Sequence, residues 1–214
     1  RWKPLDGTRD QVGQRVRTRL DRVATRAEYR TRHTAPRAEQ AKPYVEAVIE
    51  TLNAQIEAID AAIKAGLKQD KALGDAVKRL CAINGIGVTT AVERLTLMPE
   101  LGTLDRRKIA SLGGLAPHPH QSGSLDRHRF VRGGRRHLKS LLFMPALSAA
   151  RCHPALSAFY QRKIAEGKRK MVALVAVMRK LLVICNAVLK QDATTRQPPR
   201  QTPHQGTGEI QAIA

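Results

Sequence analysis

The feature of the sequence that most constrains the fold is a run of apolar residues spaced alternately by four and three positions. Its members are Val45, Ile49, Leu52, Ile56, Ile59 and Ile63. This is the spacing of a coiled-coil seam, and it predicts an amphipathic helix with Gly66 as its C-terminal stop. About three heptads are too few to decide whether this helix pairs with another chain or packs antiparallel on the helix before it.

The segment before the seam predicts a second helix, with a narrow apolar stripe on an otherwise basic surface. No proline interrupts residues 10–32, and apolar residues recur there at steps of three and four. They are Val12, Val16, Leu20, Val23 and Ala27. Pro36 and Pro43 then separate the two helices. Residues 1–70 are therefore predicted to be a basic helical connector that includes the heptad helix.

Residues 75–190 are predicted to form a compact helical domain. Helices are expected from Asp75, taken as an N-cap, and over about 88–98, 105–112, 135–151, 154–167 and 170–190. Pro145 is expected to kink the helix that contains it. Residues 113–134 are expected to be irregular, and residues 191–214 to be a disordered tail. The predicted fold class is mainly α: a long basic, coiled-coil-like connector followed by a compact helical domain with a helix-hairpin-helix motif.

The charge of the chain points to a polyanionic partner. There are 38 Lys and Arg residues against 18 Asp and Glu, a formal net charge of +20 at pH 7, and the hydrophobic content of 42% excludes wholesale disorder. One Trp, three Tyr and three Phe make base stacking a poor candidate for the binding mode. Contact with phosphates is the better candidate for the binding mode.

The cysteines and the apolar segments indicate a reducing, aqueous compartment. The cysteines are Cys81, Cys152 and Cys185. They form no CxxC pair and lie in apolar surroundings, so they are expected to be small buried hydrophobes. The longest apolar run, 171–189, is interrupted by Arg179 and Lys180, so no membrane span is expected. We therefore expect a cytoplasmic protein with no membrane partner.

Two glycines between short helical segments form a helix-hairpin-helix pattern. In the stretch Leu80–Ala91, Gly85 and Gly87 let the backbone turn tightly, and the amides of Val88 and Thr89 begin the second helix. Backbone N–H groups at a helix N-terminus bind phosphate without reading base sequence. The alternative is a plain corner that needs glycine for its backbone angles.

A second candidate site is a run of cations that leads over a glycine-rich turn into a helix start. It consists of Arg127, Arg129, Arg132, Arg135, Arg136 and Lys139. These charges repel one another unless an anion lies among them, which favours nucleic-acid contact, and the alternative is a solvated basic face. Arg106, Arg107 and Lys108 extend this patch if the fold brings their helix alongside.

Ser122 lies just before this run, in a segment rich in proline and histidine. Taken alone, a serine before glycine is most often a turn residue. Beside arginines, its hydroxyl has the chemistry to attack a phosphodiester whose developing charge those cations stabilise, with His118 or His120 as the base. The histidines and cysteines lack the spacing of metal ligands, so no metal site is expected in this chain.

Six short segments follow one another in a characteristic order. They are Leu80–Ala91, Ile109–Pro117, Gln121–Gly123, Arg132–Arg136, Pro154–Tyr160 and Val172–Leu182. Together they resemble the C-terminal domain of the bridge-RNA-guided insertion-sequence transposases, which are related to Piv-type DNA invertases. The two helices over about 8–66 are similar to the connecting helical segment of those enzymes.

The resemblance implies a recombinase of two parts, of which this chain holds the second. Ser122 falls at the family's serine, which implies a nucleophile that forms a covalent phosphoserine link to DNA. The resemblance assigns the metal-binding acidic residues, with a divalent ion that we expect to be magnesium, to an N-terminal RuvC-like domain. It also implies DNA and a noncoding guide RNA as partners, and assembly as a homo-oligomer.

Because the chain starts at Arg1 without a methionine, we expect a fragment that lacks the acidic domain and does not complete strand exchange alone. Two other interpretations stay open. One is a catalytically inactive transposase remnant that acts only as a nucleic-acid-binding module, and the other is a basic structural RNA-binding protein. Recombinase activity is therefore predicted only for this chain joined to the acidic domain.

Overall fold

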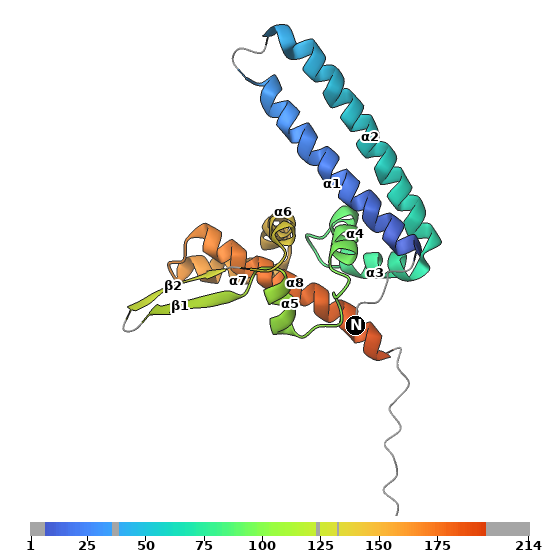
Figure 1. Ribbon diagram of the computed structural model, residues 1–214. Helices are drawn as coiled ribbons and strands as arrows, with labels where there is room; N and C mark the ends of the chain where they lie inside the picture. The colour runs from blue at the N-terminus through green and yellow to red at the C-terminus, as the bar shows by residue number, and fades with distance from the viewer. Residues whose placement is uncertain (1–6, 36–38, 123–124, 132, 196–214) are drawn as a thin grey trace, which may run out of the picture.

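The computed structural model describes residues 7–35, 39–122, 125–131 and 133–195, and it is mainly α-helical (Figure 1). The helical elements are α1 (Gly7–His33), the short 3-10 helix η1 (Glu39–Ala41), α2 (Lys42–Gln69), α3 (Lys71–Cys81), α4 (Val88–Leu97), α5 (Arg106–Leu112), α6 (Arg136–Cys152), α7 (Pro154–Ala165) and α8 (Lys170–Thr195). Two strands, β1 (Pro117–Ser122) and β2 (Leu125–Val131), form a hairpin between α5 and α6. The predicted mainly α fold class is confirmed.

α1 and α2 form a long antiparallel pair that extends away from the other helices (Figure 1). Leu52, in the heptad seam, is buried. Two polar contacts also cross the pair: Arg19 Nε donates to Oδ1 of Asp60 at 2.5 Å, and Arg26 donates to Oδ1 of Asn53 at 2.8 Å. The partner of the seam is therefore the preceding helix of the same chain.

The prediction that Gly66 ends the heptad helix is wrong, because α2 continues to Gln69. Gly66 is buried against α1, and a Cβ atom there would lie 2.7 Å from Cγ2 of Val12. The missing side chain permits the close approach of the two helices, at a cost of about 1 kcal/mol in helix propensity relative to alanine.

The start of the next helix also differs from prediction. α3 begins at Lys71 rather than near Asp75, because the side chain of Asp70 caps it by accepting a hydrogen bond from the N–H of Leu73 at 2.9 Å. Asp75 lies inside the helix and pairs with Lys78 at 3.6 Å. Since α2 ends directly before Asp70, that residue is the one placed to cap the new helix.

α8 is the central helix of the body formed by α3 to α8. Val177, Leu181 and Leu182 are fully buried, and α8 packs against α3, α5, α6 and α7. Val12 and Val16 of α1 belong to the same hydrophobic core. The α1–α2 pair is therefore anchored to the body through the N-terminal part of α1.

The length and apolar character of α8 are those of a core helix. Among the described residues, Lys170–Lys190 is the one helical segment that is long and apolar enough to cross a membrane by length and composition, despite its two internal charges. Half of its most apolar stretch is buried inside the protein. α8 also runs to Thr195, so residues 191–195, expected to begin the tail, are helical, whereas residues 196–214 lie outside the described part of the chain.

The expectation that residues 113–134 are irregular is wrong, because they contain the β1–β2 hairpin. Pro117 lies opposite Val131 at the base, and Ser122 lies opposite Leu125 at the tip. Apolar and polar residues do not alternate in these strands, so the usual sequence signal of a half-buried strand is missing. The strands pair with each other and make few contacts with the helices.

The base of the hairpin is closed by glycines with positive φ, which we call the glycine neck: Gly114 (φ +65°), Gly133 (φ +74°) and Gly134 (φ +69°). A Cβ atom on Gly134 would lie 2.2 Å from the backbone nitrogen of Gly114. The N–H of Arg135 also donates to the carbonyl oxygen of Leu112 at 2.8 Å. At the neck, backbone therefore lies on backbone with no side chain between.

The three cysteines differ in exposure. Cys185 is buried, and its burial raises the pKa of the thiol to about 12. Cys81 is half-buried, and burial raises the pKa of its thiol as well. Cys152, at the C-terminal end of α6, is exposed, so the expectation that it is buried is wrong. Its apolar sequence neighbours belong to other faces of the helix.

Candidate nucleic-acid interface

Ser122 is the last residue of β1 and lies at the tip of the hairpin. His120, two residues earlier, lies opposite Arg127 of β2. Residues opposite each other in an antiparallel pair, and residues two apart in one strand, belong to the same face of the ribbon. The backbone thus assigns Ser122, His120 and Arg127 to one face at the outer end of a hairpin that projects away from the helices (Figure 1).

The second candidate base, His118, lies closer to the base of the hairpin. It is opposite Phe130, and a register shift between His118 and His120 interrupts the strand alternation. Of the two histidines, His120 is therefore the one in regular register with Ser122.

The cations predicted as one cluster are spread along the hairpin. Arg127 and Arg129 lie in β2, Arg135 and Arg136 at the start of α6, and Lys139 in its first turn, while Arg132 lies outside the described residues. Strand residues advance by about 3.3 Å each, so the base of the hairpin is roughly 20 Å from its tip. Among the described cations of this run, Arg127 is the one nearest to Ser122 along the paired strands.

Arg135 is held by Glu100, in the connection between α4 and α5. Nη1 of Arg135 donates to Oε2 of Glu100 at 3.0 Å and to the carbonyl oxygen of Leu97 at 2.8 Å, and Nη2 donates to Oε1 of Glu100 at 2.5 Å. Partial burial opposes the ionisation of Glu100, but the hydrogen bonds and the charge of Arg135 hold its pKa below the ordinary value. This bidentate ion pair fixes the orientation of Arg135 and clamps the base of the hairpin to the α4–α5 connection.

The glycine turn before α4 leaves the N-terminus of that helix accessible. Gly85 has φ +98°, and a Cβ atom there would lie 2.7 Å from the backbone nitrogen of Ala149, so the turn is packed on α6. Gly87 is the N-cap and provides no side-chain hydrogen bond, and Val88 and Thr89 are exposed. Their amides can bind an anion. α4 and the hairpin tip lie far apart in Figure 1, so the two sites predicted from the sequence are separate.

The cations of α5 do not reach the hairpin tip. Arg106, Arg107 and Lys108 are exposed at the start of α5, and Leu112, at its other end, meets the glycine neck. Asp105 caps this helix by accepting from the N–H groups of Lys108 at 2.8 Å and Arg107 at 2.7 Å. The hydrogen bond from Lys108, followed by that from Arg107, lowers the pKa of Asp105.

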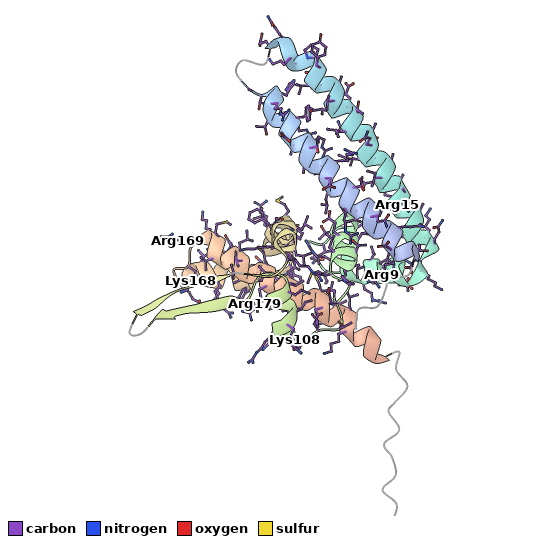
Figure 2. The ribbon with its side chains drawn as sticks, viewed as in Figure 1. Arg9, Arg15, Lys108, Lys168, Arg169 and Arg179 are labelled. Atoms are coloured by element: carbon purple, nitrogen blue, oxygen red, sulfur yellow. The ribbon has the colours of Figure 1, made fainter. Side chains whose placement is uncertain are left out.

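A further basic segment, Lys168–Lys170, joins α7 to α8 and was missed by the sequence reasoning. All three residues are exposed, and Gly167 before them has φ +76°. Figure 2 shows Lys168 and Arg169 at the end of α8 nearer to the hairpin. Positive charges at a helix N-terminus are unfavourable because they lie at the positive end of the helix dipole. Three consecutive cations at a predicted helix start are therefore a sequence signal for an anion-binding segment.

Residues 77–161 match the profile of the transposase IS116/IS110/IS902 family. This segment, from α3 into α7, is therefore similar to the transposase domain of that family. It contains the glycine turn before α4, the hairpin with Ser122, and the clamp formed by Arg135 and Glu100.

The curated proteins to which the chain is similar include two named for gene inversion. It is 31% identical over 196 residues to the pilin gene-inverting protein of Moraxella bovis, covering 89% of this chain and 60% of that protein. It is 39% identical over 118 residues to the protein of the same name from Moraxella lacunata, covering 53% of this chain and 36% of that protein. An uncharacterized 43.6 kDa protein of insertion element IS110 from Streptomyces coelicolor is 33% identical over 114 residues, covering 52% of this chain and 28% of that protein. The chain thus spans between 28% and 60% of the length of these relatives.

Proposed function

We propose that the chain is the DNA-binding and strand-cleaving part of a transposase or DNA invertase. The match of residues 77–161 to the transposase family and the similarity to two gene-inverting proteins support this proposal. Transposition and inversion both require DNA strands to be broken and rejoined. The formal charge of +20 supplies the electrostatic attraction to DNA that such a reaction needs.

In the proposed reaction Ser122 is the nucleophile. Its Oγ attacks a DNA phosphorus and forms a phosphoserine ester, while the bond from that phosphorus to the leaving deoxyribose oxygen breaks. The serine proton passes to His120, and the leaving oxygen takes up a proton. Attack on the phosphoserine by a hydroxyl group of another strand then reverses these changes, releases the serine and joins the new strand.

The observation that carries this assignment is the register of the hairpin. Ser122 and His120 belong to one strand face, and Arg127 is directly opposite His120. A guanidinium in that place can stabilise the charge that develops on the phosphoryl oxygens. The major groove of B-DNA admits a two-stranded ribbon, so a projecting hairpin has a shape that reaches the DNA backbone from a groove.

The described residues contain no group of three or more His, Cys, Asp or Glu side chains that could hold a metal ion. They therefore do not provide a magnesium site of three protein ligands, and no step of the proposed reaction passes through a metal.

We also infer a second nucleic-acid ligand, a structured guide RNA held by phosphate contacts. The exposed cations of Arg106–Lys108 and Lys168–Lys170 belong to the helical body, at the start of α5 and at the start of α8, and not to the strands of the hairpin. They supply sequence-independent contacts of the kind that hold a folded RNA. Assembly as a homo-oligomer would bring a second hairpin to the second DNA strand.

The test joins this chain to the part of the Moraxella bovis relative that lies outside the match and measures recombination of a marked donor DNA. Ser122→Ala is expected to abolish both recombination and the covalent protein–DNA adduct on a trapping substrate. Ser124→Ala, at the neighbouring serine, is the matched control and is expected to retain both. Undiminished adduct with Ser122→Ala would contradict the role of the serine. DNA binding without any adduct in either variant would instead favour a binding-only module.

A further inference from the structure

An apolar groove lies open to solvent between α6 and α8. Its volume is about 490 Å³, and it is lined by Lys139, Ser140, Phe143, Met171, Val175 and Met178. Met171, in the lining, is 58% exposed, and Met144 (65%) and Val172 (55%) are exposed elsewhere on the same two helices. Single exposed apolar residues are ordinary, but an exposed methionine inside an apolar groove is of the kind that marks an interaction site.

The lining of the groove has the geometry that receives a helix. Met171, Val175 and Met178 are separated by four and three positions, so they form a continuous stripe along α8. Lys139 and Phe143, four positions apart, form the facing wall on α6. Methionine side chains are flexible and adapt to the shape of a partner. A groove of this kind accepts apolar side chains presented at every third or fourth position of an amphipathic helix.

The cations around the groove indicate that its partner is acidic. Lys139 lines the wall formed by α6, and the exposed segment Lys168–Lys170 directly precedes Met171 on the wall formed by α8. A second copy of the same face would bring these cations against identical ones, which is unfavourable. A nucleic acid would satisfy the charges but would leave the apolar stripe without apolar contacts. A helix with an apolar stripe and acidic flanks both covers the apolar lining of the groove and places negative charges beside its cations.

We propose that the groove between α6 and α8 binds an acidic amphipathic helix of a partner protein. The apolar stripe of that helix packs against Phe143, Met171 and Met178, and its acidic flanks face Lys139 and the segment Lys168–Lys170. This interaction is separate from the DNA contacts proposed for the hairpin, because the groove belongs to the helical body.

The test uses a fluorescein-labelled peptide of about 18 residues, long enough for five helical turns, with leucines on one face and glutamates elsewhere. Its binding to the whole chain is followed by fluorescence anisotropy. Met171→Glu, at an exposed position of the groove lining where the substitution does not disturb the core, is expected to weaken binding roughly tenfold or more. Tyr44→Glu is the matched control, because Tyr44 is 78% exposed on α2 outside the groove and the substitution changes the net charge equally. It is expected to leave binding unchanged.

A charge exchange tests the polarity of the groove. Lys139→Glu is expected to weaken the glutamate peptide and to strengthen a peptide with lysine in place of glutamate. Equal loss of binding in Tyr44→Glu, or equal binding of a peptide with serines in place of leucines, would show non-specific attraction to a basic protein and would overturn the proposal. Loss of duplex DNA affinity in Met171→Glu would assign the groove to nucleic acid, and loss of self-association in sedimentation would assign it to a second copy. Either result would also overturn it.

Discussion

Single glycines control how closely separate parts of the backbone approach in this protein. Gly134 touches Gly114 across the neck, Gly85 lies on Ala149, and Gly66 lies against Val12. Gly85 and Gly134 also have positive φ, which local sequence patterns for turns anticipate. Gly66 lies inside a helix, and its requirement for space arises from an atom on another helix. Local sequence patterns therefore predict the turns at Gly85 and Gly134 correctly, but they wrongly predict that Gly66 ends a helix.

The glycine neck leads to a prediction at this scale. Gly134→Ala is expected to destabilise the protein by at least about 1 kcal/mol more than Gly133→Ala, because its methyl group also overpacks the neck. Both substitutions put a side chain on left-handed backbone, at a cost of about 1 kcal/mol or more. Only at position 134 does the new Cβ meet a backbone atom, at 2.2 Å, whereas nothing lies within 4 Å at position 133. Urea unfolding of the two variants measures the difference, and equal losses would show that the neck opens without cost.

Among the elements, the long helices were predicted well and the hairpin was not. Apolar residues at heptad spacing make a helix stable only when a neighbour covers the seam, so the spacing indicates both the helix and its need for a partner. The strands have no such pattern, because the hairpin projects from the body and buries no regular face. The glycines at its two ends were recognised as breaks, but the antiparallel pairing between them depends on how the neck aligns the two segments.

The packing of α1 on α2 can be tested at Gly66. Gly66→Ala is expected to lower the melting temperature, because overpacking against Val12 costs about 1–3 kcal/mol, more than the gain of up to about 1 kcal/mol in helix propensity. The matched control is Ala65→Leu, at the exposed neighbouring position, which is expected to change stability little. Thermal unfolding followed by circular dichroism compares the two. A melting temperature for Gly66→Ala above that of the original protein would mean that the two helices separate at no cost.

For the whole molecule, the net charge overstates the number of cations available to a ligand. Arg15 donates to the carbonyl oxygen of Ala62, Arg19 to Asp60 and Arg26 to Asn53, so these arginines join α1 to α2. Arg135, the most central member of the predicted basic run, is likewise engaged with Glu100. The sequence correctly indicates a basic protein, but the contacts of the folded chain divide its cations into structural and accessible ones.

Salt dependence of the binding of a structured RNA tests this division. With about six phosphate contacts, the logarithm of the binding constant is expected to fall against the logarithm of salt concentration with a slope on the order of −5. Replacing Lys168 and Arg169 together by alanine is expected to reduce the magnitude of that slope by about 2. Arg26→Ala, the control at an arginine engaged with Asn53, is expected to leave it unchanged. A flat salt response of the original protein would show that its basic surface is only solvated.

Residue types repeated at local spacings are enough to specify the helical class, the apolar seam and the basic character of this protein, and these features follow from the sequence alone. The folded structure was needed to show which helix covers the seam, that Ser122 ends a strand, and that Arg135 is clamped by Glu100. These features depend on contacts between residues distant along the chain, which meet only after the core around α8 has packed. Local spacing carries no information about which atoms then come together.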